Sequence, residues 1–298
     1  MTPSEARTAP LAHRRTWPAT LGLLSGPLLW LTLFFILPVI IVAAYSFGVL
    51  KLFPTGTSSA FYDWKRLLTG QSIYLGLFWK SMRVSLIVSV TCVVLAYPVA
   101  YFLALGAKKR KYVLLLVIIA PFLTSYLLRV LAWKVILGDA GVINSFLFWT
   151  GLRAAEDPIQ WLIYSQFTVM LVLAYVWIPF VALPIFVTLE NLDHSLLEAA
   201  ADLGASRWRT YLRVTLPLSL SGVLAAFVFV FIPTLGEFVT PLLVGGTRGY
   251  LYGNAISDLF TQGLDWQAGS VLSLFLLAVV AVLMAVFARF LQVRSVSA

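Results

Sequence analysis

Six apolar runs, each about as long as a lipid bilayer is thick, constrain what this chain can fold into. They cover approximately residues 21–46, 84–105, 112–137, 167–189, 218–243 and 270–291. A hydrocarbon core is roughly 30 Å thick, which about 20 helical residues span. Because lipid offers no partner to backbone N–H and C=O groups, runs of this length must be helices. The predicted fold class is therefore an all-α membrane protein with six transmembrane helices in one domain.

The composition supports this prediction. The chain of 298 residues is 61% hydrophobic and 11% charged, whereas roughly a quarter of the residues of an ordinary soluble domain are charged. Its formal net charge of +9 is compatible with nucleic acid or acidic lipid as a partner. The basic residues, however, occur in short clusters beside the apolar runs, where they report membrane topology. We therefore expect a membrane-lipid environment and no nucleic-acid partner.

These basic clusters predict the orientation of the chain. The short connector between the second and third runs reads KKRK at residues 108–111, and short cytoplasmic loops carry an excess of such residues. Alternation of the runs places three further basic segments on the same side, namely the N-terminal tail, residues 207–213 and residues 289–294. We therefore expect both termini to be cytoplasmic, with residues 1–19 as a cytoplasmic tail and residues 20–298 as the transmembrane domain.

Three longer connections remain for the opposite, outer side. They cover about residues 47–83, 138–166 and 244–269. In the second, Gly and Asn turn signals surround a short apolar stretch, LGDAGVINSFLFWTGL at residues 137–152. This pattern predicts a brief helix lying on the outer surface.

A polar, alanine-rich segment, SLLEAAADLGASRWRTYLRVTLP, lies between the fourth and fifth runs at residues 195–217. Ser195 and Glu198 have the spacing of a capping box, which predicts a helix start there. The alanines continue that helix, and Gly204 is the residue type that ends one in a left-handed conformation. Ser206 can cap a second helix, and Pro217 is expected where the next span starts. The prediction is a helix, turn and helix over about residues 195–213, held by a membrane span at each end.

The residues alone leave more than one use open for this segment. Its alanine-rich backbone and Glu198 suit insertion into a groove on another protein. Alternatively, it is an amphipathic helix resting on lipid headgroups, with Glu198 acting only as a cap. A DNA-reading helix-turn-helix also has an alanine-then-glycine turn and a basic second helix, but this loop is too short for the third helix of such a domain.

Charged residues within the membrane spans are candidate functional residues, because charge is costly there. Arg129, in SYLLRVLAWKVIL, can pair inside the bundle or line a pathway, whereas Lys134 can reach the interface. Glu237, in IPTLGEFVTPLLVGG, lies between Gly236 and Pro241, which predicts a bent or interrupted helix. A pathway role for Glu237 and a structural pairing with Arg129 both remain open.

The sequence carries no motif of an ATPase or of a membrane hydrolase. It contains no Gly-Lys dipeptide, which a Walker A loop requires, and no Gly-x-Ser-x-Gly or His-Glu-x-x-His pattern. Cys92 is the single cysteine, and His13 and His194 are far apart in the sequence. We expect no catalytic residue, no metal and no cofactor in this chain, so it is not expected to be an enzyme.

The pattern EAA-x3-G-x9-V-x-LP, which begins at Glu198 and ends at Pro217, resembles the EAA signature of binding-protein-dependent ABC transporter permeases. That family usually has Ile where Val214 stands. In the family this segment is the coupling helix, which docks into a cleft of a cytoplasmic ATPase. The resemblance implies that the ATPase-coupling residues here are Glu198, Ala199, Ala200, Gly204, Arg207 and Arg209.

The resemblance extends over nearly the whole chain and implies its architecture and partners. It implies a type I importer permease in a bacterial inner membrane, paired with a second, similar permease. An external solute-binding protein would deliver the solute by docking on the outer connections. ATP and Mg²⁺ would be bound by a dimer of ATPase subunits rather than by this chain.

The stretches LLRVLAW and GEFVTPLLVGG also resemble the spermidine and putrescine permeases. For such a polycation Glu237 would supply opposite charge, and aromatic side chains would add cation–π contacts. The substrate-pathway residues that this resemblance implies are Glu237, Arg129, Tyr126, Trp133 and Trp177. Relatives with similar motifs carry opines or amino-acid derivatives, which are alternative solutes. Outside the family, the alternative is a secondary transporter with its coupling-ion residues in one chain.

Overall fold

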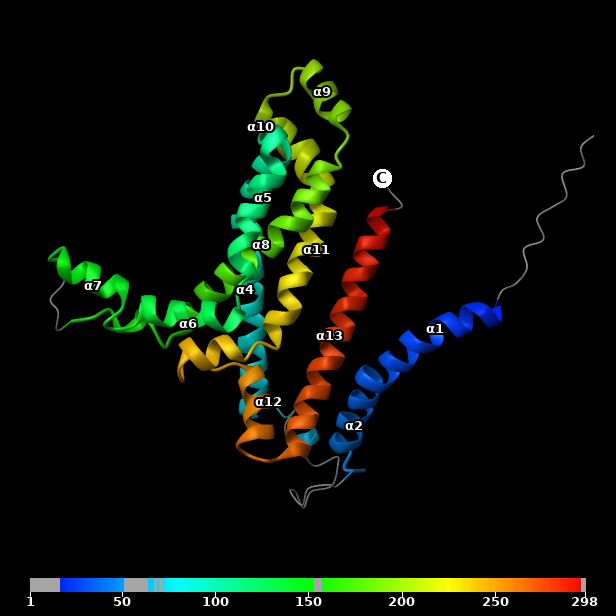
Figure 1. Ribbon diagram of the computed structural model, residues 1–298, viewed down its shortest axis with the longest axis vertical. Helices are drawn as coiled ribbons and strands as arrows, with labels where there is room; N and C mark the ends of the chain where they lie inside the picture. Colours follow the sequence, from blue (N-terminus) through cyan, green and yellow to red (C-terminus); the bar gives the residue numbers. More distant parts are fainter. Residues whose placement is uncertain (1–16, 51–63, 67–68, 70–71, 153–156, 296–298) are drawn as a thin grey trace, which may run out of the picture.

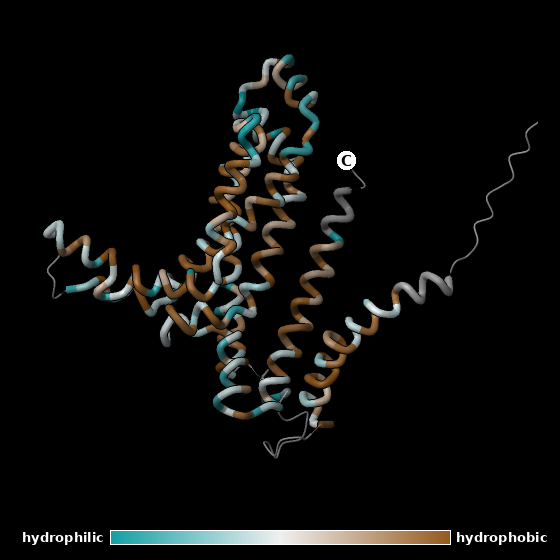
Figure 2. The backbone as a smooth tube through the Cα atoms, in the orientation of Figure 1, coloured by the Kyte–Doolittle hydropathy of each residue, from teal (hydrophilic) through white to brown (hydrophobic). Residues whose placement is uncertain are grey.

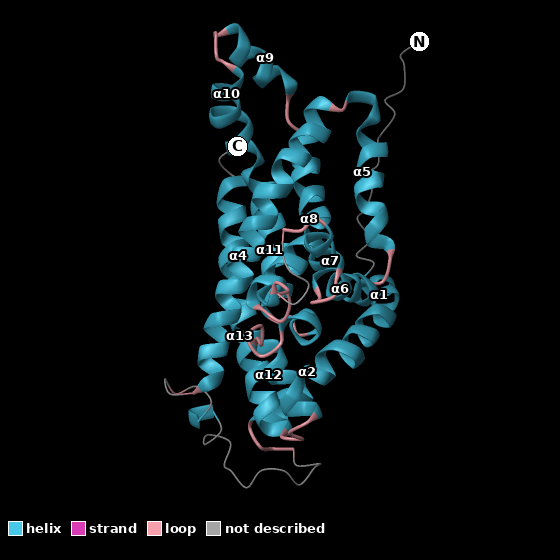
Figure 3. Ribbon diagram, turned by 90° about the vertical axis from the view of Figure 1, so that its left-hand side faces the viewer, coloured by secondary structure: helices cyan, strands magenta, loops and turns pink. Residues whose placement is uncertain are grey.

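The computed structural model describes residues 17–50, 64–66, 69, 72–152 and 157–295. These residues form helices and loops, with no strand among them (Figure 3). Within this part of the chain six helical stretches are long and apolar enough to cross a membrane: Leu24–Ser46, Ile73–Gly106, Tyr126–Trp149, Gln166–Glu190, Arg207–Leu235 and Trp266–Arg289. The predicted six-span, all-α membrane fold is confirmed. Of the expected N-terminal tail, residues 1–16 lie outside the described residues, and Trp17 begins the first helix.

The α-helices have the labels of Figure 1. They are α1 (Trp17–Leu31), α2 (Leu37–Ser46), α4 (Ile73–Tyr101), α5 (Lys111–Ile119), α6 (Tyr126–Leu137), α7 (Val142–Trp149), α8 (Gln166–Glu190), α9 (His194–Asp202), α10 (Arg207–Thr210), α11 (Leu216–Leu235), α12 (Tyr252–Thr261) and α13 (Trp266–Ser295). Shorter, tighter 3₁₀ turns are η3 (Lys108–Arg110), η4 (Ala120–Leu123) and η5 (Gln160–Leu162). Wider π-helical turns are η1 (Thr32–Ile36), η2 (Phe102–Gly106), η6 (Tyr211–Thr215) and η7 (Pro241–Gly245).

The core of the molecule lies where α4, α8 and α11 pack side by side (Figure 1). A helix that is apolar all round must be covered by protein or by lipid. In α8, 56% of the span is buried within the chain, compared with 6% of Leu24–Ser46 and 11% of Trp266–Arg289. The first helix and α13 therefore leave most of their apolar surface for lipid or for another subunit.

Small and polar residues hold the three central helices close together. Gly222 of α11 faces α8 so closely that a Cβ atom there would lie 2.2 Å from Thr188 Oγ1 and 2.9 Å from the Pro184 carbonyl oxygen. Glycine is favoured at such positions because it lets two helix backbones approach each other in a membrane. Tyr97 of α4 and Ser219 of α11 share a buried hydrogen bond of 2.8 Å.

Several helices continue through prolines by widening for one turn. Pro38 and Pro217 each follow a π-helical turn, η1 and η6, and neither interrupts its helix. Because proline has no N–H and its ring crowds the preceding turn, a wider turn relieves the clash without ending the helix. Pro217 lies in the first turn of α11, as expected for the start of the next span. The helix does not begin there, however, because α10, η6 and α11 form one continuous helical stretch, Arg207–Leu235.

The third apolar run, residues 112–137, is not one helix as predicted. α5 ends at Ile119, η4 follows, and Thr124 and Ser125 are extended, with ψ of 161° and 132°, before α6 begins. Ala120, before Pro121, keeps helical geometry with φ −50° and ψ −44°, and Pro121 lies within η4, so the chain changes direction only after η4, at Thr124 and Ser125. α6 then leads away from the bundle axis toward α7 (Figure 1). The short helix predicted within residues 137–152 is confirmed as α7.

The two ends of the molecule have different characters. The α9–α10 loop, the basic η3 turn and the C-terminal end of α13 lie at one end, and α12 and the end of α2 lie at the other (Figure 1). Hydrophilic residues concentrate on the α9–α10 loop, beyond the apolar helices (Figure 2). The described basic segments thus share one end, as the alternation of spans predicts.

The tight contact at Gly222 gives a stability prediction. Gly222→Ala should destabilise the isolated subunit by about 1–3 kcal/mol, the usual range for overpacking a filled core. Gly76→Ala is the matched control, because Gly76 also lies in a helix but has no atom within 4 Å of the added Cβ. Thermal denaturation in detergent should lower the midpoint for Gly222→Ala only. Equal midpoints for the two variants would show that α8 and α11 are not in close contact here.

Candidate functional site

The polar α9–α10 segment (residues 193–215) begins at a cap that the sequence interpretation missed. Asp193 is the N-cap of α9, and its Oδ1 accepts a hydrogen bond from the Ser195 backbone N–H at 2.9 Å. The predicted capping box of Ser195 and Glu198 is therefore wrong, because the helix starts at His194. The hydrogen bonds from Ser195 hold the pKa of the Asp193 carboxyl below its usual value.

The C-terminal end of α9 is the turn that Gly204 predicts. Gly204 has φ +75°, in the left-handed region that glycine adopts without strain. Its N–H donates to the Ala201 carbonyl at 2.9 Å, and the Ala205 N–H donates to the Ala200 carbonyl at 3.0 Å. These two bonds form a Schellman motif, which satisfies carbonyls that a helix end would otherwise leave free. Ser206 then caps α10 by accepting from the Arg209 N–H, as predicted.

The residues of the EAA-like signature lie on the outside of this segment. Glu198, Ala199, Gly204, Arg207 and Arg209 are exposed, and Ala200 is half-buried. Four large apolar side chains of the segment are also exposed, and the most exposed are Leu203 at 88% and Trp208 at 68%. Such residues are ordinarily covered, and their exposure beside arginines at a polar end favours contact with another protein over contact with lipid tails.

A cavity of about 480 Å³ separates α9 from the helix bundle. Its walls include Tyr101 at the end of α4 and Phe102 of η2, together with His194, Ala201 and Arg207 from the segment itself. α9 thus stands off from the core at one end of the molecule (Figure 3). A helix with so few covering contacts can tilt as a unit.

α10, in contrast, is joined rigidly to the bundle. It continues through η6 into α11 without a break. Trp208 stacks on Tyr211 with ring centroids 5.4 Å apart. Tyr211 in turn meets the rings of Tyr97 and Tyr101 edge-on, at 5.9 and 5.7 Å. A displacement of the segment would therefore be passed to both α4 and α11.

Glu237 lies where helical structure is interrupted after α11, as predicted. α11 ends at Leu235 and helical geometry resumes before η7. The Glu237 Oε1 accepts from the backbone N–H groups of Val239 and Thr240, at 2.8 and 3.0 Å. This carboxylate thus caps the resumed helix. Its suggested ion pair with Arg129 does not form, because among the described residues the ion pair within 4 Å is that of Lys111 and Glu190.

Tyr126 and Arg129, on the first turn of α6, lie beside that break. The Tyr126 hydroxyl is hydrogen-bonded to Thr240 Oγ1 and interacts electrostatically with both Glu237 and Arg129. The Arg129 guanidinium lies over the Phe122 ring, 4.8 Å from its centroid. Its Nε and Nη1 atoms are buried and have no hydrogen-bond partner among the described residues. A buried donor without a partner is energetically costly, so these atoms mark a place where an acceptor would be favoured.

The two predicted pathway tryptophans belong to one connected group of rings. Trp133 meets Tyr175 at 5.3 Å, and Tyr175 meets Phe122 at 5.5 Å. Phe122 meets Phe180 at 6.2 Å, and Phe180 meets Trp177 at 6.0 Å. This aromatic group joins η4, α6 and α8.

Sequence reasoning missed three of the five rings in this aromatic group. Phe122, Tyr175 and Phe180 were not singled out, because they lie on two separate segments and only the fold brings them together. Phe122 also receives Arg129, so it connects the charged and aromatic parts of the site. Among the described residues no three His, Cys, Asp or Glu side chains group as a metal site would require.

Comparison with known proteins places this arrangement in a family. A family model described as the binding-protein-dependent transport system inner membrane component matches residues 73–296. The spermidine/putrescine transport system permease protein PotB of Salmonella typhimurium strain SL1344 is 34% identical over 266 residues, which are 87% of this chain and 89% of that protein. PotB of Escherichia coli K12 is 34% identical over 267 residues, covering 87% of this chain and 93% of that protein.

Solved structures show the same fold at low sequence identity. A chain in the crystal structure of a bacterial ABC transporter that imports the acidic polysaccharide alginate superposes with a TM-score of 0.70 and 18% identity, over 93% of this chain and 96% of that one. A second alginate transporter structure, in complex with its alginate pentasaccharide-bound periplasmic protein, gives a TM-score of 0.69 and 18% identity, over 92% and 93%. The chain therefore belongs to the binding-protein-dependent transport system inner membrane components, as a multi-pass permease subunit of an ABC importer in the inner membrane.

Proposed function

We propose that the α9–α10 segment of this permease faces the cytoplasm and docks into a partner ATPase, which drives import of a polyamine. One observation supports the docking most strongly. A cavity separates α9 from the bundle, and the segment exposes Leu203 and Trp208 together with residues of the EAA-like signature. Fully burying a large apolar side chain is worth about 1.5–3 kcal/mol. A cleft that covered both side chains would therefore be bound favourably.

The remaining partners follow from the surfaces that this chain leaves open. A second permease subunit, identical or similar, would cover the arm formed by α6 and α7 and complete the pathway. A dimer of ATPase subunits would hold ATP and Mg²⁺. At the outer face a solute-binding protein would deliver the solute near a cavity of about 690 Å³, which Asp139, Asp157 and Arg248 help to line.

A polyamine is the solute supported best by the relatives and by the chemistry of the break. The PotB proteins of both species are spermidine/putrescine permeases by name. Glu237 supplies negative charge where the helix is interrupted, and the rings of Tyr126, Trp133 and Trp177 can face ammonium groups. Arg129 repels a cation, so we assign it to packing on Phe122 rather than to contact with a polyamine.

One observation favours a second candidate solute, an opine or another amino-acid derivative. The unpartnered Nε and Nη1 atoms of Arg129 would be satisfied by a carboxylate, which polyamines lack. Replacement of Arg129 by Gln distinguishes the two solutes. Uptake of a polyamine should survive Arg129→Gln, whereas uptake of a carboxylate-bearing solute should fall with it.

The docking is tested by adding a side chain at Gly204. Gly204→Asn should leave the subunit folded, because Asn tolerates left-handed backbone and no atom lies within 4 Å of the added Cβ. In the assembled transporter the added side chain should obstruct the cleft, lowering solute uptake about tenfold, the equivalent of roughly 1.4 kcal/mol. Uptake and solute-stimulated ATP hydrolysis are measured together.

Gly151→Asn is the matched control for that experiment. Gly151 also has a left-handed φ, +71°, and no atom within 4 Å, but it follows α7, far along the chain from the segment. We expect Gly151→Asn to transport normally. The docking assignment fails if both variants transport equally well.

Glu237→Gln separates the two roles of that carboxylate. The glutamine oxygen can still accept from the N–H groups of Val239 and Thr240, so the helix cap should persist while the charge is lost. For spermidine we expect KM to rise about tenfold, or roughly 1.4 kcal/mol, in a subunit that assembles normally. Unchanged kinetics would remove Glu237 from the pathway and leave it only a cap.

A further inference from the structure

Glu190 and Lys111 each carry a charge of the wrong sign for their own helix. Glu190 is the last residue of α8, where the helix dipole is negative, and Lys111 is the first residue of α5, where it is positive. Each charge is disfavoured at such an end. Residues 108–110, which form η3 before Lys111, are also basic, so four cationic residues in succession lead into α5. Local helix energetics alone therefore do not explain either residue.

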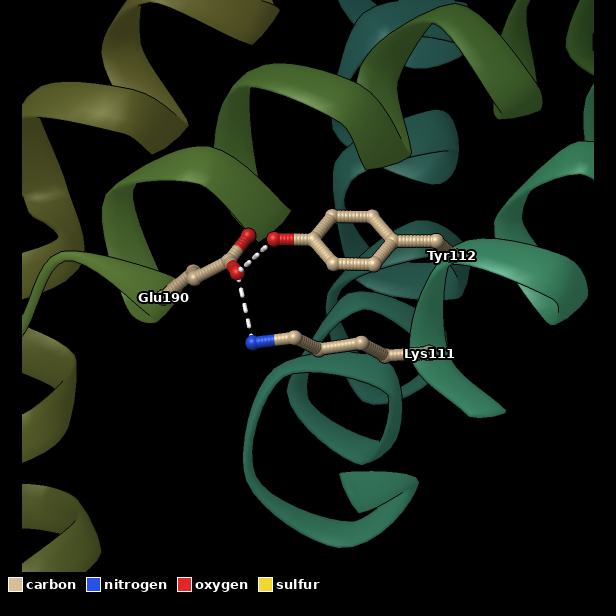
Figure 4. A network of polar contacts seen from close by, with 3 residues as sticks. All are labelled: Lys111, Tyr112 and Glu190. Carbon is tan, nitrogen blue, oxygen red and sulfur yellow. Dashed lines mark hydrogen bonds and ion pairs between the residues drawn. The ribbon is translucent and has the colours of Figure 1, made fainter. Parts of the chain in front are cut away.

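The two residues compensate each other across the bundle. Lys111 Nζ lies 2.5 Å from Glu190 Oε1, and the Tyr112 hydroxyl donates to the same oxygen at 2.6 Å (Figure 4). Among the described residues this is the ion pair that forms within 4 Å. The hydrogen bond to Glu190 raises the pKa of Lys111 above its usual value. The ammonium therefore stays charged until the pH rises above the ordinary lysine range, so the pair persists throughout the neutral range.

The pair lies between the α9–α10 segment and the membrane pathway. Glu190 precedes Asp193, the cap of α9, by three residues. Lys111 begins α5, which continues through η4 and Phe122 to the break before α6. Thus one partner is attached to the segment, and the other is attached to the arm that carries Arg129.

We propose that Glu190 is a positioning residue that passes a displacement of α9 to α5 and, through η4, to α6. The inference rests on the proposed docking of the α9–α10 segment to an ATPase. Without the pair, α9 would still dock, but α5 would no longer follow the end of α8. ATP hydrolysis would then continue with little movement of α6.

Fluorescence at α6 of the assembled transporter tests this directly. Val135 is 69% exposed on α6, and the chain's single cysteine, Cys92, is buried, so in this chain Val135→Cys provides one accessible thiol, to be labelled with bimane before assembly with the partner subunits. In the otherwise unchanged chain, ATP should change the bimane emission. Absence of that change would count against the proposed function itself, before the role of Glu190 is considered.

Charge reversal then tests the pair. Glu190→Lys and Lys111→Glu should each reduce the ATP-induced change about fivefold or more, the low end of allosteric couplings. The double variant restores opposite charges and also matches both helix dipoles, so it should recover the signal to within about twofold. Lys109→Glu makes the same charge change in the same turn without touching the pair and should leave the signal intact.

Two milder substitutions test whether the charge reversals act only by preventing assembly of the transporter. Glu190→Gln and Tyr112→Phe keep the shapes of the side chains and should give intermediate signals at normal ATPase binding. The proposal is overturned if the single reversals leave the signal unchanged. It is also overturned if the double variant assembles but recovers nothing, since a merely structural defect would then explain the loss.

Discussion

The backbone hydrogen bonds of a chain in lipid must be made within the protein, and the rest of this structure depends on that requirement. Where a helix is interrupted, backbone N–H and C=O groups lose their helical partners, and side chains form hydrogen bonds with them instead. At the break after α11, Glu237 accepts from two backbone N–H groups and Asn254 donates to the Phe238 carbonyl at 2.9 Å. Gly253 packs so tightly there that a Cβ would lie 2.5 Å from the Gly236 carbonyl oxygen. The break after α11 is thus stabilised by specific hydrogen bonds and close packing.

Much of this fold could be predicted from the lengths of the apolar runs. The positions at which helices are interrupted could be predicted only in part. The Gly236 and Pro241 signals around Glu237 predict an interruption, and one is present. Pro121 carries a similar signal, yet the continuous apolar run around it led to one helix where two form. Pro217 correctly predicted the start of α11, but the wider turn η6, which joins α10 to α11 without a break, was not predicted. A proline therefore indicates that backbone geometry must change, but tertiary packing decides whether the helix ends.

The site shows the same division between local and long-range information. Gly204 and Ser206 were predicted because their roles depend on backbone within a few residues. Asp193 was missed because Ser195 offered an equally good local cap. The pairing of Lys111 with Glu190 and the ring contacts of Phe122 join segments far apart in the sequence, and a single sequence gives no sign of them. The polar end thus combines a locally encoded helix turn with contacts that exist only in the folded bundle.

The central claim is that the α9–α10 segment faces the cytoplasm and is covered there by an ATPase. Because Cys92 is buried, Leu203→Cys would place a single reactive thiol at the most exposed apolar position of the segment. Labelling with a membrane-impermeant maleimide is the direct measurement. The account predicts no labelling in intact cells, labelling in inverted vesicles stripped of the ATPase, and protection when the ATPase is restored. Labelling from outside intact cells, or no protection by the ATPase, would contradict it.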